Sequence, residues 1–196
     1  MAHVAAIVVA AGQGVRAGGD LPKQFRRIWG DTLLQRALSA FAGVPAVSLV
    51  QPVIRPDDLT LVRSLTDGMD VLAPVSGGAT RQASVRAGLE ALEPRKPDIV
   101  LVHDAARPFA SADLIARAIE AAAQTGAAIP ALPVTDTVKR VNQTGTIEAT
   151  LDRNALRLVQ TPQAFAFPPC LKHIGAPQRR VAMISPTMRR SQNGPE

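Results

Sequence analysis

The sequence is poor in the residue types that define several common classes of protein. Its 196 residues include one cysteine, one tryptophan, no tyrosine and only 3% aromatic residues. The single cysteine, Cys170, excludes an internal disulfide and a cysteine-ligated metal cluster. The scarcity of aromatic rings argues against a protein that stacks the bases of single-stranded nucleic acid.

Long hydrophobic segments are also absent, because the longest apolar run, residues 4–11, has the length of a strand. A transmembrane helix needs about 20 consecutive apolar residues, so no segment of this sequence can span a bilayer. Met1, Ala2 and His3 lead directly into the apolar run, without the basic region and cleavage site of a signal peptide. We therefore expect a cytoplasmic protein.

The positive charge of the chain is concentrated near its C-terminal end. Residues 169–196 hold five lysine and arginine residues against one glutamate, which accounts for +4 of the net charge of +6. The first 168 residues are only weakly basic, so we do not expect the body of the protein to bind nucleic acid. A nucleic-acid binder that acts through the basic tail stays open as an alternative.

What the sequence does contain is an alternation of strand and helix patterns. With 46% hydrophobic and 19% charged residues, the chain has the composition of one globular domain with a sizeable core. Strand patterns lie at residues 4–11, 47–54, 71–73, 98–102 and 127–134. Helical patterns lie at residues 33–41, 59–65, 85–92 and 114–122. The alternation predicts an α/β fold, a Rossmann-like and mostly parallel sheet with helices on both faces.

Several single residues sharpen this prediction. We expect Asp31 and Ser111 to cap two of the helices, and Thr80 could cap a third, because their side chains can accept hydrogen bonds from the first free N–H groups. Pro52 removes a hydrogen-bond donor from the second strand, which indicates an edge position or a bulge there.

Residues 137–151 depart from the alternation. β-Branched residues flank a turn at residues 142–145, which predicts a β-hairpin with too few large apolar side chains for the core. We expect an arm, about residues 135–153, that projects and packs on a second subunit. A short strand at residues 156–159 and a polar turn at residues 160–163 follow it.

Three polar loops follow the first, third and fourth predicted strands, so they meet at one edge of the sheet, where ligands bind. The first loop contains Gly12 and Gly14, followed by Arg16 and Lys23. Glycines let backbone N–H groups approach phosphate oxygens, although a tight turn alone explains them equally well. The loop lacks the Gly-Lys-Ser/Thr of a P-loop. The two cations favour a polyphosphate ligand.

The other two loops carry fewer but more chemically distinct side chains. Asp104 follows the fourth strand, where a carboxylate can hold Mg²⁺ with phosphates or can cap a turn. Arg107 could pair with Asp104 or reach a phosphate. His103 has no sequence neighbour that would make it a base, so we interpret it as structural. The loop at residues 77–81, with Ser84, could contact a base or ribose, or could be an ordinary helix cap.

Seven motifs run in one order over about the first 168 residues, at residues 10–16, 21–24, 77–85, 102–108, 133–139, 152–154 and 160–165. The glycine loop and the Pro-Lys loop are shared by many nucleotidyltransferases, whereas His-Asp-Ala-Ala-Arg-Pro together with Asp-Arg-Asn and Thr-Pro-Gln is more particular. Together the motifs resemble the sugar-phosphate nucleotidyltransferases and, more narrowly, the 2-C-methyl-D-erythritol 4-phosphate cytidylyltransferase family.

The resemblance implies a reaction of non-mevalonate isoprenoid biosynthesis. The 4-phosphate of methylerythritol attacks the α-phosphorus of CTP, releasing pyrophosphate and forming 4-diphosphocytidyl-2-C-methyl-D-erythritol. It also implies a homodimer in which the arm brings substrate contacts to the neighbouring subunit. Alternatives are a cytidylyltransferase for another polyol phosphate and an inactive homologue that binds CTP or a partner.

The resemblance also implies roles for individual residues. Arg16 and Lys23 stabilise phosphate charge, Arg153 joins them as a catalytic residue, and Asp104 holds the Mg²⁺ cofactor. Without the resemblance, the spacing of Arg153 indicates no role beyond that of a solvated or paired surface charge. The residues implied for the nucleotide site are Ala10, Ala11, Gly12, Gly14, Gly78 and Ser84. Those implied to meet methylerythritol phosphate, besides Arg153, are Arg107, Thr137 and Thr161.

The C-terminal part departs from the family pattern. Family members continue with a helical segment and a strand bearing a catalytic lysine, near a second metal-binding carboxylate, and this sequence has neither. We interpret residues 169–196 as an altered or truncated C-terminus, a divergent basic tail without regular order after a nucleotidyltransferase domain at residues 1–168. We expect the sheet to lack its last strand and the activity to be reduced or lost. A cyclodiphosphate synthase domain is fused downstream in some relatives.

Overall fold

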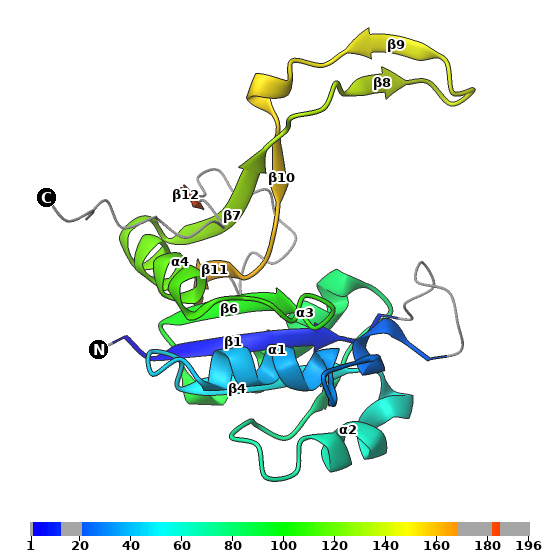
Figure 1. The fold of residues 1–196 in the computed structure, drawn as a ribbon. Coiled ribbons are helices and arrows are strands. Elements are labelled where there is room, and N and C mark those ends of the chain that lie inside the picture. Colours follow the sequence, from blue (N-terminus) through cyan, green and yellow to red (C-terminus); the bar gives the residue numbers. More distant parts are fainter. Residues whose placement is uncertain (1, 13–20, 168–181, 185–196) are drawn as a thin grey trace, which may run out of the picture.

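The computed structural model describes residues 2–12, 21–167 and 182–184 of the chain. An eight-stranded sheet has the strand order β10-β7-β11-β6-β1-β4-β5, with β12 paired to β7 (Figure 1). The strands are β1 (Val4–Ala10), β4 (Leu49–Ile54), β5 (Val75–Ser76), β6 (Ile99–Asp104), β7 (Ala127–Pro133), β10 (Arg157–Val159), β11 (Gln163–Ala166) and β12 (Ala182–Ile184). The pairs that join β1, β4, β5 and β6 are parallel, as are β7 and β12, whereas β10 and β11 are antiparallel to their neighbours.

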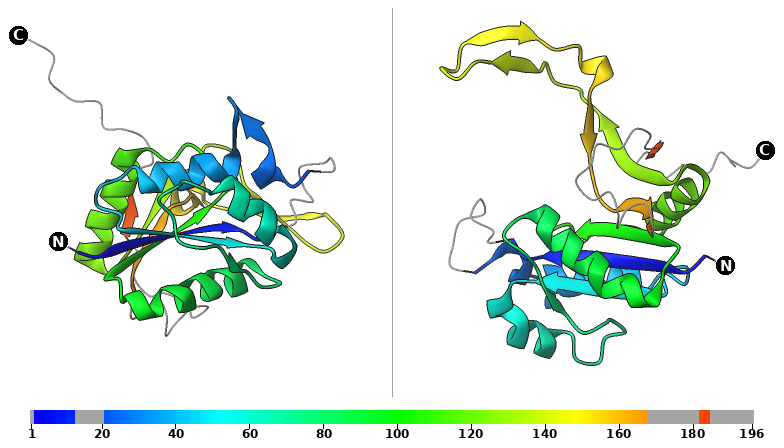
Figure 2. Two further views of the ribbon diagram at one scale, coloured as in Figure 1. Left: turned by 90° about the horizontal axis from the view of Figure 1, so that it is seen from below. Right: turned by 180° about the vertical axis from the view of Figure 1, so that it is seen from behind.

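Helices cover both faces of this sheet, which confirms the predicted α/β fold (Figure 2). The helices are α1 (Leu33–Ala42), α2 (Leu59–Leu65), α3 (Arg81–Leu92) and α4 (Ala112–Thr125). Short 3₁₀ turns are η2 (Lys23–Phe25), η3 (Pro56–Asp58), η4 (Glu93–Arg95) and η5 (Arg153–Ala155). In the described part of the chain, no helix is long and apolar enough to cross a membrane.

The central strand β1 is buried on both sides because its successive side chains point to opposite faces. Val4, Ala6 and Val8 pack in one core cluster with α1 and α4. Ala5 and Ile7 pack in the other cluster with α3. This explains why the strand reads as an uninterrupted apolar run instead of an alternating one.

Two helix caps agree with the sequence and one does not. The Thr80 hydroxyl accepts a hydrogen bond from the N–H of Ala83, and Ser111 caps α4 in the same way. The prediction of Asp31 as the cap of α1 is wrong, because Thr32 forms a reciprocal capping box with Gln35. Asp31 instead belongs to β3 (Asp31–Thr32), paired with β2 (Arg27–Ile28).

The outer edge of the sheet also differs from the prediction. The strand expected at residues 71–73 is absent, and β5 begins at Val75 inside the expected loop. Before β5, the Gln51 side chain donates a hydrogen bond to the Ala73 carbonyl at 2.8 Å, which takes the place of a ladder bond. β4 lies between β1 and β5, so it is not an edge strand as predicted for Pro52. β5 pairs only with Val53 and Ile54, which leaves Pro52 without a ladder partner on that side.

The other end of the sheet contains more strand than expected. β6 extends through Asp104, and β11 follows the polar turn at residues 160–163, where no strand was expected. The expected loss of the last strand is wrong, because β12 pairs parallel to β7, with Ala182 opposite Ala128. The remainder of the predicted tail lies outside the described residues.

The predicted arm is present as a two-stranded hairpin that projects from the body (Figure 1). It consists of β8 (Lys139–Val141) and β9 (Ile147–Thr150), which are antiparallel. The Asn142 side chain accepts hydrogen bonds from the N–H groups of Thr144 and Thr146 and so closes the turn between the strands. Almost every side chain of the hairpin is exposed, so within one chain the arm has little to pack against.

Candidate active site

The three polar loops meet at one edge of the sheet, as the sequence predicts. Ala10 ends β1 opposite Ile54 of β4, and Asp104 ends β6 opposite Val9. The N–H of Gly77 donates to the Ile54 carbonyl at 2.7 Å, which brings the second loop to the same edge. Ligands bind at this edge in open α/β sheets.

The start of the first loop is held by a buried glutamine. Gln24 donates hydrogen bonds from its amide to the carbonyls of Ala10 at 3.0 Å and Gly12 at 3.2 Å. These bonds hold the turn that carries Gln24 and the neighbouring exposed Lys23 against the end of β1. The sequence reasoning missed Gln24, whose only signal is its place directly after the lysine. Gly14 and Arg16 lie outside the described residues.

The second loop approaches β1 so closely that a side chain at residue 77 would not fit. A Cβ atom on Gly77 would lie 2.6 Å from the Ala11 Cβ and 2.7 Å from the Ser84 Oγ. Ser84 is buried, and its hydroxyl donates to the Thr80 carbonyl at 2.9 Å and accepts from the Gly78 N–H at 3.2 Å. Ser84 therefore shapes the loop from beneath, and its hydroxyl is already engaged by the loop backbone.

The third loop presents a carboxylate between two cations. Arg81 Nε lies 2.9 Å from one oxygen of Asp104, and Arg107 Nε lies 3.5 Å from the other. The predicted pairing of Arg107 with Asp104 is thus confirmed, whereas Arg81 was not anticipated as a partner. The only feature of the sequence that points to Arg81 is its position at the start of α3, directly after the glycine loop. All three side chains are partly exposed, so the cluster is open to an anionic ligand.

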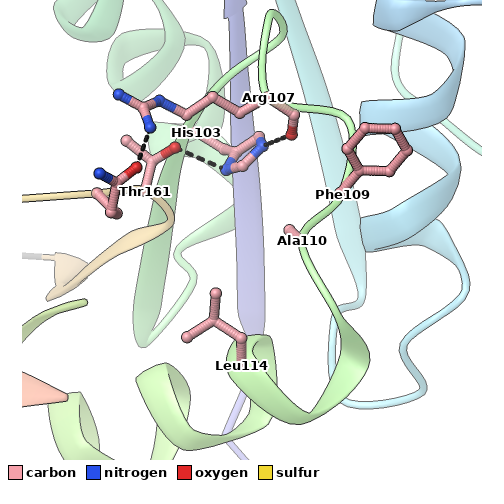
Figure 3. Close-up of a pocket in the computed structure, with 7 residues that line it drawn as sticks. His103, Arg107, Phe109, Ala110, Leu114 and Thr161 are labelled. Carbon is pink, nitrogen blue, oxygen red and sulfur yellow. Dashed lines mark hydrogen bonds between the residues drawn. The ribbon is translucent and has the colours of Figure 1, made fainter. Parts of the chain in front are cut away.

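A buried histidine supports this loop (Figure 3). His103 Nε2 lies 2.8 Å from the Arg107 carbonyl, and Nδ1 lies 3.0 Å from the Thr161 hydroxyl. A carbonyl can only accept, so Nε2 carries the proton and the Thr161 hydroxyl donates to Nδ1. Burial lowers the pKa of His103 below 6.5 and so favours the neutral ring. His103 is structural, as the sequence indicates.

A pocket of about 240 Å³ opens beside the histidine (Figure 3). One part of its lining is polar and comes from Arg107, Gln160 and Thr161, and Arg107 also donates a hydrogen bond to Gln160. The other part is apolar and comes from Phe109 and Leu114, with Ala110 between them. A small ligand with a charged group and a carbon skeleton suits this lining.

Two predicted site residues lie apart from this edge. Thr137 and Arg153 are exposed in the arm, which extends away from β1 and β6 (Figure 1). Arg153 donates a hydrogen bond to the Thr135 carbonyl at 2.6 Å, so it is held at the base of the arm. One chain therefore assembles the residues of the three loops but does not bring these two to them.

The donor set at this edge fits one kind of metal site. Among the described residues, no group of three or more histidine, cysteine and acidic side chains could hold a metal ion. Asp104 offers one partly exposed carboxylate at the ligand-binding edge. Mg²⁺ is commonly bound by one or two carboxylates together with substrate phosphates and water. Asp104 fits such a shared site.

Comparisons with known proteins find relatives of this chain by sequence and by fold. The family model of 2-C-methyl-D-erythritol 4-phosphate cytidylyltransferase matches residues 4–184, past the expected limit at residue 168 and through β12. Bifunctional IspD/IspF enzymes of Bradyrhizobium sp. and Nitrobacter hamburgensis are 57% and 58% identical to it over 165 residues, 84% of this chain. The chain spans only 42% and 41% of the length of these relatives.

Solved structures give the same result. The 4-diphosphocytidyl-2C-methyl-D-erythritol synthase of Anaerococcus prevotii is 26% identical with a TM-score of 0.79, over 94% of this chain and 87% of that one. The 2-C-methyl-D-erythritol 4-phosphate cytidylyltransferase of Thermus thermophilus is 33% identical with a TM-score of 0.71, over 91% and 87%. The chain therefore belongs to the 2-C-methyl-D-erythritol 4-phosphate cytidylyltransferase family.

Proposed function

We propose that this chain transfers the cytidylyl group of CTP to 2-C-methyl-D-erythritol 4-phosphate. The observation that carries the proposal is the meeting of the Ala10–Gly12 backbone, the glycine loop at residues 77–78 and the Asp104 cluster at one sheet edge, in a chain of this family. The products are 4-diphosphocytidyl-2-C-methyl-D-erythritol and pyrophosphate. The reaction belongs to non-mevalonate isoprenoid biosynthesis.

The chemistry is a displacement at phosphorus. An oxygen of the 4-phosphate forms a bond to the α-phosphorus of CTP, and the bond from that phosphorus to the bridging oxygen of the β-phosphate breaks. Pyrophosphate leaves with the bonding electrons. Such a reaction needs alignment and neutralisation of charge more than covalent participation by the protein.

One group of residues aligns CTP and neutralises its charge, and another binds the second substrate. Ala10, Ala11, Gly12, Gly14 and Gly78 line the CTP site, with Ser84 shaping it from below. Arg16 and Lys23 neutralise charge on the triphosphate as the bond breaks. Mg²⁺ held by Asp104 would supply further positive charge to the phosphates. The pocket beside Arg107 and Thr161 accepts the methylerythritol phosphate.

The remaining contacts come from a second copy of the chain. Thr137 and Arg153 lie in the arm that projects from the body. A homodimer that exchanges arms places them at the site of the partner. A cytoplasmic location fits a protein that uses a free nucleotide and has a single cysteine.

The proposal is tested by measuring pyrophosphate release from the full chain with CTP, Mg²⁺ and methylerythritol phosphate. We expect turnover with CTP and none with UTP, at a reduced rate because the sequence lacks the C-terminal lysine of the family. Turnover with ribitol 5-phosphate in place of methylerythritol phosphate would assign another polyol phosphate. CTP binding by calorimetry without turnover contradicts the proposed activity and leaves an inactive homologue.

A further inference from the structure

The side chain of Arg81 is held by a single partner at the candidate site. Its Nε donates a hydrogen bond to one oxygen of Asp104 at 2.9 Å, and the described part of the chain offers its guanidinium no other hydrogen bond or ion pair. The Arg81 side chain is 48% exposed, so water screens this pair. Exposed ion pairs of this kind contribute little free energy, so a stronger partner can displace them.

Arg107 contacts the other oxygen of Asp104 but is held from several sides. Its Nε lies 3.5 Å from that oxygen, and its guanidinium also donates a hydrogen bond to Gln160 (Figure 3). Its backbone carbonyl lies 2.8 Å from the Nε2 of the buried His103. Of the two cations on this carboxylate, Arg107 is therefore fixed by its surroundings, whereas Arg81 can change its partner.

The place of Arg81 on its helix points to a ligand and not to the stability of the helix. Arg81 is the first residue of α3, and the first turn of that helix contains no acidic residue. A positive charge at this end opposes the helix dipole, which is unfavourable for the helix itself. The helix end and the guanidinium together favour an anion at this edge of the sheet.

The two arginines compete with any metal ion for the carboxylate of Asp104. Each of its oxygens is engaged by one guanidinium group. A divalent cation that binds one of these oxygens shares its lone pairs with a guanidinium and is repelled by the positive charge of that group. Both obstacles disappear when one arginine moves away, and Arg81 is the arginine with fewer contacts.

We propose that Arg81 is an exchangeable partner of Asp104, which gives up the carboxylate to Mg²⁺ and then binds the phosphates of CTP. The inference rests on the proposed function, which brings the metal ion and the nucleotide to this edge of the sheet. The exchange couples the two ligands, because Asp104 withholds the guanidinium from phosphate until another cation takes its place. The site then favours CTP that arrives with its metal ion over CTP without one.

Calorimetry with metal-free CTP, in a buffer that contains EDTA, tests whether Asp104 restrains Arg81. We expect Asp104→Asn to bind metal-free CTP roughly fivefold more tightly than the wild type, because the guanidinium is released to the phosphates. The same change in an Arg81→Ala background should give a gain of about twofold at most, from the lost repulsion of the carboxylate alone. An equal gain in both backgrounds, or no gain in either, overturns the proposal.

Binding of Mn²⁺ to the full chain without nucleotide measures the other half of the exchange. Mn²⁺ suits the same oxygen ligands as Mg²⁺, and electron paramagnetic resonance measures how much of it stays free in solution. Arg81→Ala should bind Mn²⁺ roughly threefold more tightly than the wild type, because the competing cation is gone. Unchanged or weaker binding overturns the proposal.

Two further variants calibrate the Mn²⁺ measurement. Asp104→Asn gives the binding that comes from other sites of the chain. Arg86→Ala is the matched control and should bind Mn²⁺ as the wild type does, since Arg86 lies on the same helix and pairs with Glu90. Circular dichroism should show every variant folded, because the side chains of Arg81 and Asp104 are both partly exposed.

These binding experiments need neither the second substrate nor turnover, so their outcomes separate this proposal from the proposed function. The expected changes in CTP and Mn²⁺ affinity without any pyrophosphate release contradict the reaction alone and support the exchange. Pyrophosphate release by a chain whose Mn²⁺ affinity does not respond to Arg81→Ala overturns the exchange and leaves the reaction intact.

Discussion

Asp104 lies between Arg81 and Arg107, and this arrangement sets the charge of the candidate site. The two guanidinium groups exceed the one carboxylate, so the cluster is positively charged and suits the phosphates of the proposed substrates. Because these side chains are partly exposed, the ion pairs contribute little to folding, about 0–1 kcal/mol each. In the proposed function they position the carboxylate and bind the phosphates.

Arg81 is therefore expected to matter for turnover and not for stability. We predict that Arg81→Ala lowers kcat/KM for CTP roughly tenfold, which corresponds to about 1.4 kcal/mol of lost interaction. Arg86→Ala is the matched control, since Arg86 lies on the same helix and pairs with Glu90 away from the sheet edge. Steady-state kinetics on both variants decide the matter, and equal activities would remove Arg81 from the site.

His103 makes the stability of the protein depend on pH. Burial lowers its pKa in the folded chain below the value of 6.5 that applies when the chain is unfolded. Between these two pKa values the unfolded state binds more protons, so the free energy of unfolding falls as pH drops below 6.5. For this one group the slope is at most about 1.4 kcal/mol per pH unit.

Thermal melts of the wild type and of His103→Gln between pH 8 and 5 measure this effect. We expect the wild type to lose more stability on acidification than the variant, because glutamine does not titrate. Carboxylates contribute equally to both proteins at the lower end of this range. Identical slopes would mean that His103 is not held neutral by its surroundings.

The loop that follows β5 is shaped by its own helix. Ser84 of α3 binds the backbone of Gly78 and Thr80 through one hydroxyl. We predict that Ser84→Ala raises KM for CTP severalfold and lowers stability by about 1–2 kcal/mol, since it removes the hydroxyl that accepts from the Gly78 N–H. Ser64→Ala on α2 is the control, because the Ser64 hydroxyl is exposed and binds only the Leu61 carbonyl. Equal KM values would place Ser84 outside the nucleotide site.

The sequence predicts which helices and strands form better than it predicts the residues at which they begin and end. Thr80 and Ser111 cap helices as expected, because each directly precedes its helix and its hydroxyl accepts from the N–H three residues further on. Thr32 replaces Asp31 because Gln35 completes a capping box that only Thr32 can join. β5 starts late because the Gln51 side chain pairs with Ala73 across the sheet edge, a contact that no local pattern encodes.

In the described part of the molecule, the body holds most of the proposed site, and the side chains of the arm are almost all exposed. The sequence could predict that three loops share an edge, since parallel strands place their ends together. It could not predict that Gln24 binds Ala10 or that Arg81 reaches Asp104, because these contacts join residues far apart in the chain. In the proposed dimer, the place of Arg153 relative to the site is set by the second copy, which the sequence of one chain does not encode locally.

Site sharing predicts complementation between two inactive variants. Asp104→Asn disables the body and Arg153→Gln disables the arm, so each homodimer should be inactive. Mixed dimers contain one site in which both residues are intact, so re-equilibrated equal mixtures should regain roughly a quarter of wild-type activity. Measured pyrophosphate release that stays at the level of the separate variants would show that both residues act within one chain.

The central claim is the transfer of a cytidylyl group, and phosphorus NMR of a single reaction mixture tests it most directly. With the full chain, CTP, Mg²⁺ and methylerythritol phosphate, we predict that the phosphate monoester signal of methylerythritol phosphate decreases as paired diphosphate signals and pyrophosphate appear together. A spectrum in which CTP and the monoester persist unchanged, while the protein is folded and binds CTP, would contradict the account.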